Sequence, residues 1–346
     1  MPAAEPGDWP PGARVAVRFD RFMEACLYDE ANGFYTARGG SAGRRGDFIT
    51  SAEVGPLFGT VLARWLDAVW EDLGRPDPFE VADVGAGPGT LGRSLRAGAG
   101  RCREALQLTL VERSAAGRAR HDPEVGASVA DLGQVATAHV IVANELLDNL
   151  PVRLFEHRDT GWVEVWIGPV GVEHRPAEAL LPGCAAALAN LGPGAEVPVA
   201  EVAGRWVDDA LRVLEPGGRL LVLDYGATTA ELATRSRDGW LRTFRQQQRG
   251  SGPFDDPGEQ DLTCEVPVDQ LPAPASVDRQ TDWLRRWGID ELVAEGRRIW
   301  QERAGIGDLA ALRARSRVSE AAALLDPAGL GAFLVMEWRA GRGHTE

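Results

Sequence analysis

The chain has 346 residues, of which 44% are apolar and 25% charged, and 51 acidic residues against 37 basic ones give a formal net charge of −14. These values are typical of an acidic globular protein, and they exclude a non-specific nucleic-acid binder, which draws its affinity from clustered cations. All 37 basic residues are arginine, which we attribute to composition bias. No segment approaches the ~18 apolar residues of a membrane span, so we expect no membrane insertion.

The first predicted element is an amphipathic helix over residues 15–28, whose apolar side chains recur at helical spacing. A stretch rich in glycine and arginine follows it. A hydroxyl group at Thr50 or Ser51 is then expected to cap a long helix that ends near Leu73.

From residue 80 onward, short apolar runs alternate with helical stretches, which predicts a parallel sheet with crossover helices. The predicted strands cover 80–84, 107–112, 139–143 and 219–224. A β-hairpin over 152–167 interrupts the alternation, and a helix over 308–325 precedes a last strand over 332–338. The chain is therefore predicted to be an α/β protein.

The sharpest motif is a glycine-rich turn between the first of these strands and the next helix. It contains Asp83, Gly85, Ala86, Gly87 and Gly89. Its spacing is G-x-G-x-G and not the G-x-G-x-x-G of dinucleotide sites. The glycines allow a ligand to approach the backbone, the helix start favours a carboxylate, and the aspartate favours an ammonium group. An amino acid joined to a nucleoside meets all three demands, which indicates S-adenosyl-L-methionine.

Two acidic residues further along fit the nucleoside part of that ligand. Glu112 ends the second strand and is expected to accept hydrogen bonds from the ribose hydroxyls. Asp131, followed by Leu132, is expected near the adenine. We also assign Thr50 to the cofactor site.

The methyl acceptor is expected beyond the strand over 139–143, where Asn144, Glu145 and Asp148 follow one another closely. Ligands of open α/β sheets bind at the carboxyl ends of the strands, so we assign catalysis to these three side chains and add Asn144 to the cofactor site. A guanidinium acceptor would be held by such carboxylates through paired hydrogen bonds. A capped helix start is the alternative interpretation of this segment.

Four further residues are predicted to contact the acceptor: Asp47, Glu53, Asp224 and Tyr225. The first two require the N-terminal segment to fold over the site, and the last two lie at the end of the predicted strand over 219–224. No C-x-x-C or H-x-H pattern is present, so we predict no metal site. No Ser-His-Asp arrangement or Walker lysine indicates another chemistry.

Together these segments resemble the MidA family of class I S-adenosylmethionine-dependent methyltransferases, whose mitochondrial members are arginine methyltransferases that assist assembly of respiratory complex I. The resemblance spans most of the chain. It rests on matching motifs at 21–23, 33–35, 46–51, 83–91, 143–152, 224–226, 260–263 and 326–333. Departures include Ala52, where proline is usual, and Leu146 with Leu147, where aromatic residues are common.

The resemblance implies a Rossmann-like, seven-stranded sheet with its last strand antiparallel, an N-terminal helical cap and an inserted hairpin and helical region. The implied division is a cap over 1–78 that packs over the active site and a methyltransferase domain over 79–346, with insertions at about 152–205 and 227–300. It also implies the cofactor role of Gly85, Gly87, Gly89 and Glu112.

The sequence therefore predicts a cytoplasmic methyltransferase that acts on an arginine of a partner protein, such as a complex I subunit, and that forms a possible homodimer. Two rival functions stay open. One is methylation of a small molecule or peptide natural product in an apolar pocket near Leu146, Leu147 and the hairpin tryptophans Trp162 and Trp166. The other is a non-catalytic assembly chaperone.

Overall fold

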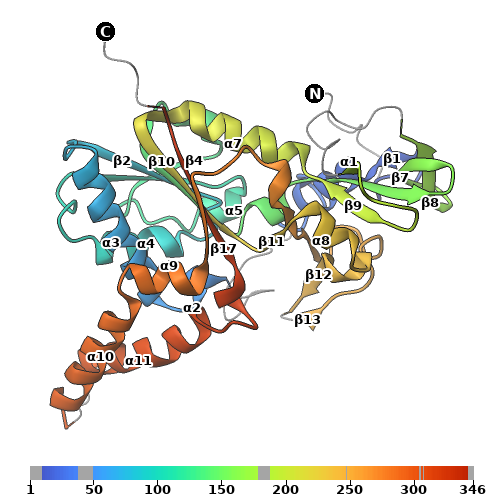
Figure 1. Cartoon of the computed structure of the whole chain (residues 1–346). Coiled ribbons are helices and arrows are strands. Elements are labelled where there is room, and N and C mark those ends of the chain that lie inside the picture. The colour runs from blue at the N-terminus through green and yellow to red at the C-terminus, as the bar shows by residue number, and fades with distance from the viewer. Residues whose placement is uncertain are drawn as a thin grey trace.

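A seven-stranded sheet forms the centre of the computed structural model, which describes residues 10–37, 50–177, 188–246, 248–303, 305–306 and 308–341 (Figure 1). The strand order is β16-β17-β10-β5-β2-β3-β4. The five strands from β10 to β4 are parallel, and β17 is antiparallel to both of its neighbours. The predicted methyltransferase sheet with an antiparallel last strand is thus confirmed.

The strands of this sheet are β2 (Phe79–Val84), β3 (Leu106–Val111), β4 (Ala127–Val129), β5 (Ala138–Asn144), β10 (Leu214–Asp224), β16 (Ser276–Arg279) and β17 (Leu334–Arg339). The apolar runs in the sequence predicted five of them to within a few residues. No apolar run marked β4 and β16, because both are short edge strands with mostly exposed side chains.

Helices cover both faces of the sheet. On one face α3 (Pro56–Asp72), α4 (Thr90–Gly98), α9 (Gln280–Arg286) and α10 (Ile289–Arg303) bury their apolar sides together with Val81, Val140 and Leu221. On the other face α1 (Phe19–Tyr28) and α7 (Glu201–Val213) pack with Ala82, Ile141 and Val222. Successive strand residues therefore point to opposite cores, as the pleat requires.

The N-terminal helix begins later than predicted. Val17–Arg18 form β1, which pairs with Ile167 and Trp166 of a neighbouring strand, and α1 starts only at Phe19. Val15, which the helical pattern placed on the buried face, is 71% exposed. Pairing with a strand edge fixes the extended backbone here, so the helical pattern was wrong for the first four residues.

The long helix predicted to start near residue 50 is broken. A single turn, α2 (Ser51–Val54), is separated from α3 by Gly55, and Pro56 opens the second helix. Neither Thr50 nor Ser51 caps α2 with its side chain, because the Ser51 hydroxyl donates to Gln280 instead. This tertiary contact was not visible in the sequence.

A second sheet lies beside the first and contains the predicted hairpin, which is confirmed. Its strands are β1, β6 (Arg153–Arg158), β7 (Gly161–Gly168), β8 (Gly171–Pro176) and β9 (Glu196–Val199). The smaller elements that follow are β11 (Gly226–Ala227), α8 (Thr229–Ala233), β12 (Leu241–Arg245), β13 (Gln248–Arg249), β14 (Asp261–Cys264) and β15 (Val266–Pro267).

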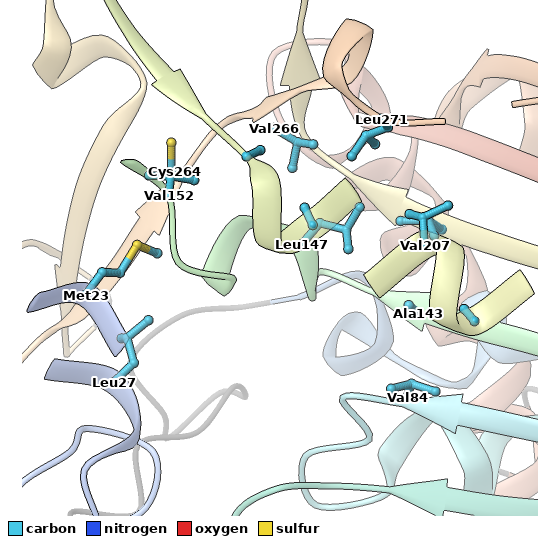
Figure 2. Close-up of a cluster of buried hydrophobic side chains, with 14 of the residues drawn as sticks. Met23, Leu27, Val84, Ala143, Leu147, Val152, Val207, Cys264, Val266 and Leu271 are labelled. Atoms are coloured by element: carbon cyan, nitrogen blue, oxygen red, sulfur yellow. The ribbon is translucent and has the colours of Figure 1, made fainter. Parts of the chain in front are cut away.

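One apolar core joins the two sheets. Figure 2 shows Leu27 of α1, Leu147 of the 3₁₀ turn η2 (Leu147–Asn149), Val207 of α7 and Ala143 of β5 around the same buried region. The N-terminal helix and the inserted segments therefore share a core with the methyltransferase sheet.

Near the C-terminus, α10 and α11 (Leu309–Leu324) form a helical hairpin that extends away from the sheet (Figure 1). Asp308 caps α11 by accepting a hydrogen bond from the Ala311 N–H group, so the predicted helix is confirmed. Within the described residues, no helix combines the length and apolar character needed to cross a membrane.

Candidate active site

A cavity of about 590 Å³ opens at the carboxyl ends of β2, β3, β4 and β5. This is where ligands bind in open α/β sheets. The glycine-rich turn after β2 forms one wall, and Thr50, Ala52 and Glu53 form another. The cavity therefore brings together segments that lie far apart in the sequence.

The glycine-rich turn needs its glycines for conformational reasons. Gly85, Gly87 and Gly89 have φ angles of 76°, 52° and 76°, in the left-handed region that side chains disfavour. Apart from Gly87 and its two chain neighbours, no atom of the described residues lies within 4 Å of the place where a Cβ of Gly87 would stand, and Gly87 lines the cavity. The side of Gly87 on which a Cβ would stand is thus open to a ligand.

Asp83 lies at the bottom of the cavity with only 2% of its surface exposed. Its Oδ2 atom has no hydrogen-bond partner in the described part of the chain. Burial raises the pKa of this carboxyl group to about 7. A cationic ligand group beside Oδ2 would restore its charge, so Asp83 fits an ammonium group.

Glu112 bridges the two loops that follow β2 and β3. One carboxylate oxygen accepts a hydrogen bond from the Gly87 N–H group at 2.9 Å, and the other accepts one from the Ser114 N–H group at 2.6 Å. Removal from water raises the pKa of Glu112, while both hydrogen bonds oppose that shift. Each oxygen keeps acceptor capacity for a ribose hydroxyl.

The part of the cavity beside Asp131 and Leu132 suits a flat nucleobase. Asp131 caps a 3₁₀ turn, η1 (Leu132–Gln134), by accepting from the Gly133 N–H group, and it also lines the cavity beside Leu132. Trp206 of α7 lines the cavity too. Apolar surface and a carboxylate are thus available to an adenine.

At the near end, Asn144 and Glu145 line the cavity directly after β5. Glu145 has a φ angle of 54°, which is rare for a residue with a side chain. Its Oε1 atom accepts hydrogen bonds from the Ser51 N–H group at 2.7 Å and from Nδ2 of Asn144 at 3.1 Å. Removal from water raises the pKa of Glu145 to about 8.

Behind Glu145 lies a layer of buried carboxyl groups. Asp224 is fully buried, and its two oxygens accept hydrogen bonds from the backbone N–H groups of Leu147, Asp148 and Tyr225. Burial raises the pKa of Asp148 to about 7 and that of Asp261 to about 8. Within the described residues, none of the ion pairs involves these carboxyl groups, so no cation offsets the effect of burial on their pKa values.

Most predicted site residues are brought together at this cavity. Those that line it are Thr50, Glu53, Asp83, Gly85, Ala86, Gly87, Glu112, Asp131, Leu132, Asn144 and Glu145. Gly89, Asp148, Asp224 and Tyr225 do not line it. Gly89 is the N-cap residue before α4, while the other three support the turn after β5 and the neighbouring β14, with the Tyr225 hydroxyl donating to Thr263. Asp47 lies outside the described residues.

Several lining residues were not predicted. Tyr28 and Tyr35 stack on each other and line the cavity, and the Tyr35 hydroxyl donates to Asp261 at 2.9 Å. Asn149 also lines the cavity and donates to the same carboxyl group. The motifs around these residues contributed to the family resemblance, but their individual roles depend on contacts between distant segments.

A family model described as "Putative S-adenosyl-L-methionine-dependent methyltransferase" matches residues 61–284. The protein arginine methyltransferase NDUFAF7 of Rattus norvegicus mitochondria is 26% identical over 314 residues, which are 78% of this chain and 70% of the relative. The Drosophila melanogaster homologue is 26% identical over 295 residues, or 71% of this chain. That match spans 63% of the fly protein, which is less than two thirds of its length.

Among solved structures, a likely methyl transferase from Burkholderia thailandensis bound to S-adenosyl-homocysteine is similar with a TM-score of 0.77 and 26% identity. The similarity covers 94% of this chain and 88% of the other. The cavity, with its open Gly87 backbone, unpartnered Asp83 oxygen and bridging Glu112, fits the same cofactor. The chain belongs to this MidA-like family of S-adenosyl-L-methionine-dependent methyltransferases.

Proposed function

We propose that this chain methylates an arginine nitrogen of a partner protein. The observation that carries the proposal is the acidic character of the acceptor end of the cavity, where Glu145 and Glu53 face the open space. Asp148, Asp224 and Asp261 lie buried behind it. A guanidinium group can donate paired, charge-assisted hydrogen bonds to the carboxylates that face the cavity, Glu53 and Glu145.

The cofactor, when bound, supplies a methyl group on a positively charged sulfur. Asp83, Gly87 and Glu112 would hold the cofactor, and the acceptor nitrogen would take its methyl group while the electron pair of the broken C–S bond stays on sulfur. The nitrogen then loses a proton. Glu145 is the proposed base, because it lines the cavity and its pKa lies near working pH.

The names of the mitochondrial relatives support a protein substrate, since they are called protein arginine methyltransferases. We propose that the partner is a protein such as a respiratory complex I subunit and that the enzyme acts in the cytoplasm. The predicted homodimer stays a prediction.

A small-molecule acceptor is the second candidate, and one observation favours it. Leu146 and Leu150 give the acceptor end an apolar wall. The other residues that suggested this function do not line the cavity: Leu147 is 2% exposed in the core, and Trp162 and Trp166 lie elsewhere on the hairpin. The support is therefore weaker than for a cationic acceptor.

The test compares arginine methylation of complex I subunits by mass spectrometry in cells with the protein, without it, and with Glu145→Gln in its place. We expect a methylated arginine only with the unmodified protein. Unchanged arginine methylation in all three strains would refute the proposed substrate, and a methylated small molecule in the same extracts would favour the second candidate.

A further inference from the structure

Glu145 adopts a conformation that needs support from outside its own segment. A φ angle of 54° persists in a residue with a side chain only where the surroundings hold it. One hydrogen bond to its carboxylate comes from the adjacent Asn144, which moves with it. The other comes from the Ser51 N–H group at 2.7 Å, which ties the carboxylate to a different element.

The position of Ser51 is in turn fixed by a contact with another helix, α9. Ser51 opens α2, a helix of four residues, and one turn of helix is not stable by itself. The Ser51 side chain is fully buried, and its Oγ donates to Oε1 of Gln280 at 3.1 Å. Gln280 is also fully buried, at the first position of α9.

The chemistry of its neighbours fixes the orientation of the Gln280 amide group. Its Nε2 faces the backbone oxygen of Leu324 at 3.1 Å, at the end of α11. Because a carbonyl oxygen only accepts hydrogen bonds, the NH₂ group must face Leu324 and the amide oxygen must face Ser51. The Ser51 hydroxyl therefore donates to Gln280, while the Ser51 N–H group separately donates to Glu145.

Helix α11 also contacts the residues that follow α2. Glu320 lies one turn before Leu324 and accepts a hydrogen bond from the Leu57 N–H group at 2.9 Å, in the first turn of α3. A Cβ on Gly55 would stand 2.3 Å from the Glu320 carboxyl carbon, so the two elements are in close contact. The start of α2 is thus linked to α11 through Gln280 of α9, and the residues that follow α2 contact α11 directly.

We infer that Gln280 is a positioning residue for Glu145: by fixing Ser51, it directs the Glu145 carboxylate into the cavity and stabilises its charged form. The inference rests on the proposed role of Glu145 as the base. The titratable groups around Glu145 are Asp148 of η2, Asp224 at the end of β10 and Glu53 of α2. All of them are carboxyl groups, whose negative charge disfavours the charged form of Glu145. The hydrogen bond from Ser51 favours that form and so opposes them.

The test uses Gln280→Leu, Ser51→Ala and the double variant in the full chain, with an arginine-containing acceptor. We expect kcat to fall about tenfold while KM for the acceptor changes by less than about twofold, and the pH of half-maximal kcat/KM to rise by roughly one unit. The double variant should be no slower than either single one, because both remove the same hydrogen bond.

Thr281→Val is the matched control. The Thr281 hydroxyl bonds to the backbone oxygens of Leu325 and Gly331 at 3.3 and 3.1 Å, near the same end of α11, and those bonds do not involve Ser51. We expect it to lower the melting temperature without moving the pH profile. An equal shift in this control, or an unshifted profile in Gln280→Leu, would overturn the inference.

A second readout does not depend on activity. Carbon-13 NMR of the glutamate carboxyl groups, with the Glu145 signal identified by its loss in Glu145→Gln, should show a higher pKa in Gln280→Leu and Ser51→Ala. If the signal moves but no acceptor is methylated, the proposed function fails and the positioning role stands. If methyl transfer occurs and the pKa does not move, the positioning role is wrong.

Discussion

At the scale of single residues, the two ends of the cavity offer different groups: one end is suited to bind the cofactor and the other to act on the acceptor. The cofactor end offers backbone groups and two carboxylates that keep free acceptor capacity, Asp83 and Glu112. The acceptor end offers Glu145, whose pKa is raised to about 8 because its carboxyl group is removed from water. Substitutions at the two ends should therefore separate binding of the cofactor from catalysis.

Gly87→Arg should abolish binding of S-adenosyl-L-methionine. A side chain at this position would occupy the cavity, and the φ angle of 52° would also be strained. Isothermal titration calorimetry measures the effect. Gly74→Arg is the matched control, because Gly74 has a φ angle of 81° and open space around it, but lies outside the cavity. Equal loss of binding in both variants would contradict the assignment.

Glu112→Gln should weaken cofactor binding by roughly ten- to a hundredfold, the usual cost of losing a hydrogen bond to a charged group. The two oxygens of Glu112 face the N–H groups of Gly87 and Ser114, so a glutamine must direct its own NH₂ group at one of these donors. The measurement is again calorimetry, with the exposed Glu124→Gln as control. Unchanged affinity would exclude Glu112 from the cofactor site.

At the scale of secondary-structure elements, the N-terminal segment depends on α11. The start of α3 has no side-chain cap of its own, and Glu320 accepts a hydrogen bond from its Leu57 N–H group instead. A carboxylate near a helix start also interacts favourably with the helix dipole. The contact links residues 263 positions apart, so sequence periodicity gives no sign of it.

Glu320→Ala should lower the free energy of unfolding by about 1–3 kcal/mol, because it leaves a buried N–H group without its partner. Glu320→Gln should cost less, since its amide oxygen can still accept from Leu57. Denaturant unfolding measures both, and Ser319→Ala, at an exposed position on the same helix, serves as control. A loss below 0.5 kcal/mol, roughly that of an ordinary surface substitution, would contradict the capping role.

At the scale of the whole molecule, the buried carboxyl groups make stability depend on pH. Burial raises the pKa of Asp83 and Asp148 to about 7 and of Asp261 to about 8. In the unfolded chain these groups titrate near pH 4. Between about pH 4 and pH 8 the folded state therefore binds more protons than the unfolded state, and stability must fall as the pH rises.

We expect the free energy of unfolding of the cofactor-free protein to decrease from pH 5 to pH 8. Asp261→Asn should make the decrease shallower, because it removes one titrating group while its amide oxygen can still accept from the Tyr35 hydroxyl. Denaturant unfolding at several pH values checks this, with Asp159→Asn in an exposed turn as control. A free energy of unfolding that rises from pH 5 to pH 8 would contradict the predicted direction of this pH dependence.

The sequence by itself determined the parallel sheet, the glycine-rich turn and the residues at the ends of its strands. These features follow from local rules: apolar runs mark β2, β3, β5 and β10, and the turn after β2 needs glycines for its left-handed backbone. Because parallel strands place their carboxyl ends at one edge, Glu112 and Glu145 were predictable as neighbours of one cavity.

Only the tertiary structure decided which polar residues reach that cavity. Asp148 and Asp224 carry the same carboxyl group as Glu145, yet they face inward and support the turn after β5. Tyr35, Ser51 and Gln280 take their places through contacts with partners more than 75 residues away. Hydrogen bonds between distant segments are specified by packing, and packing leaves no periodic signal in the sequence.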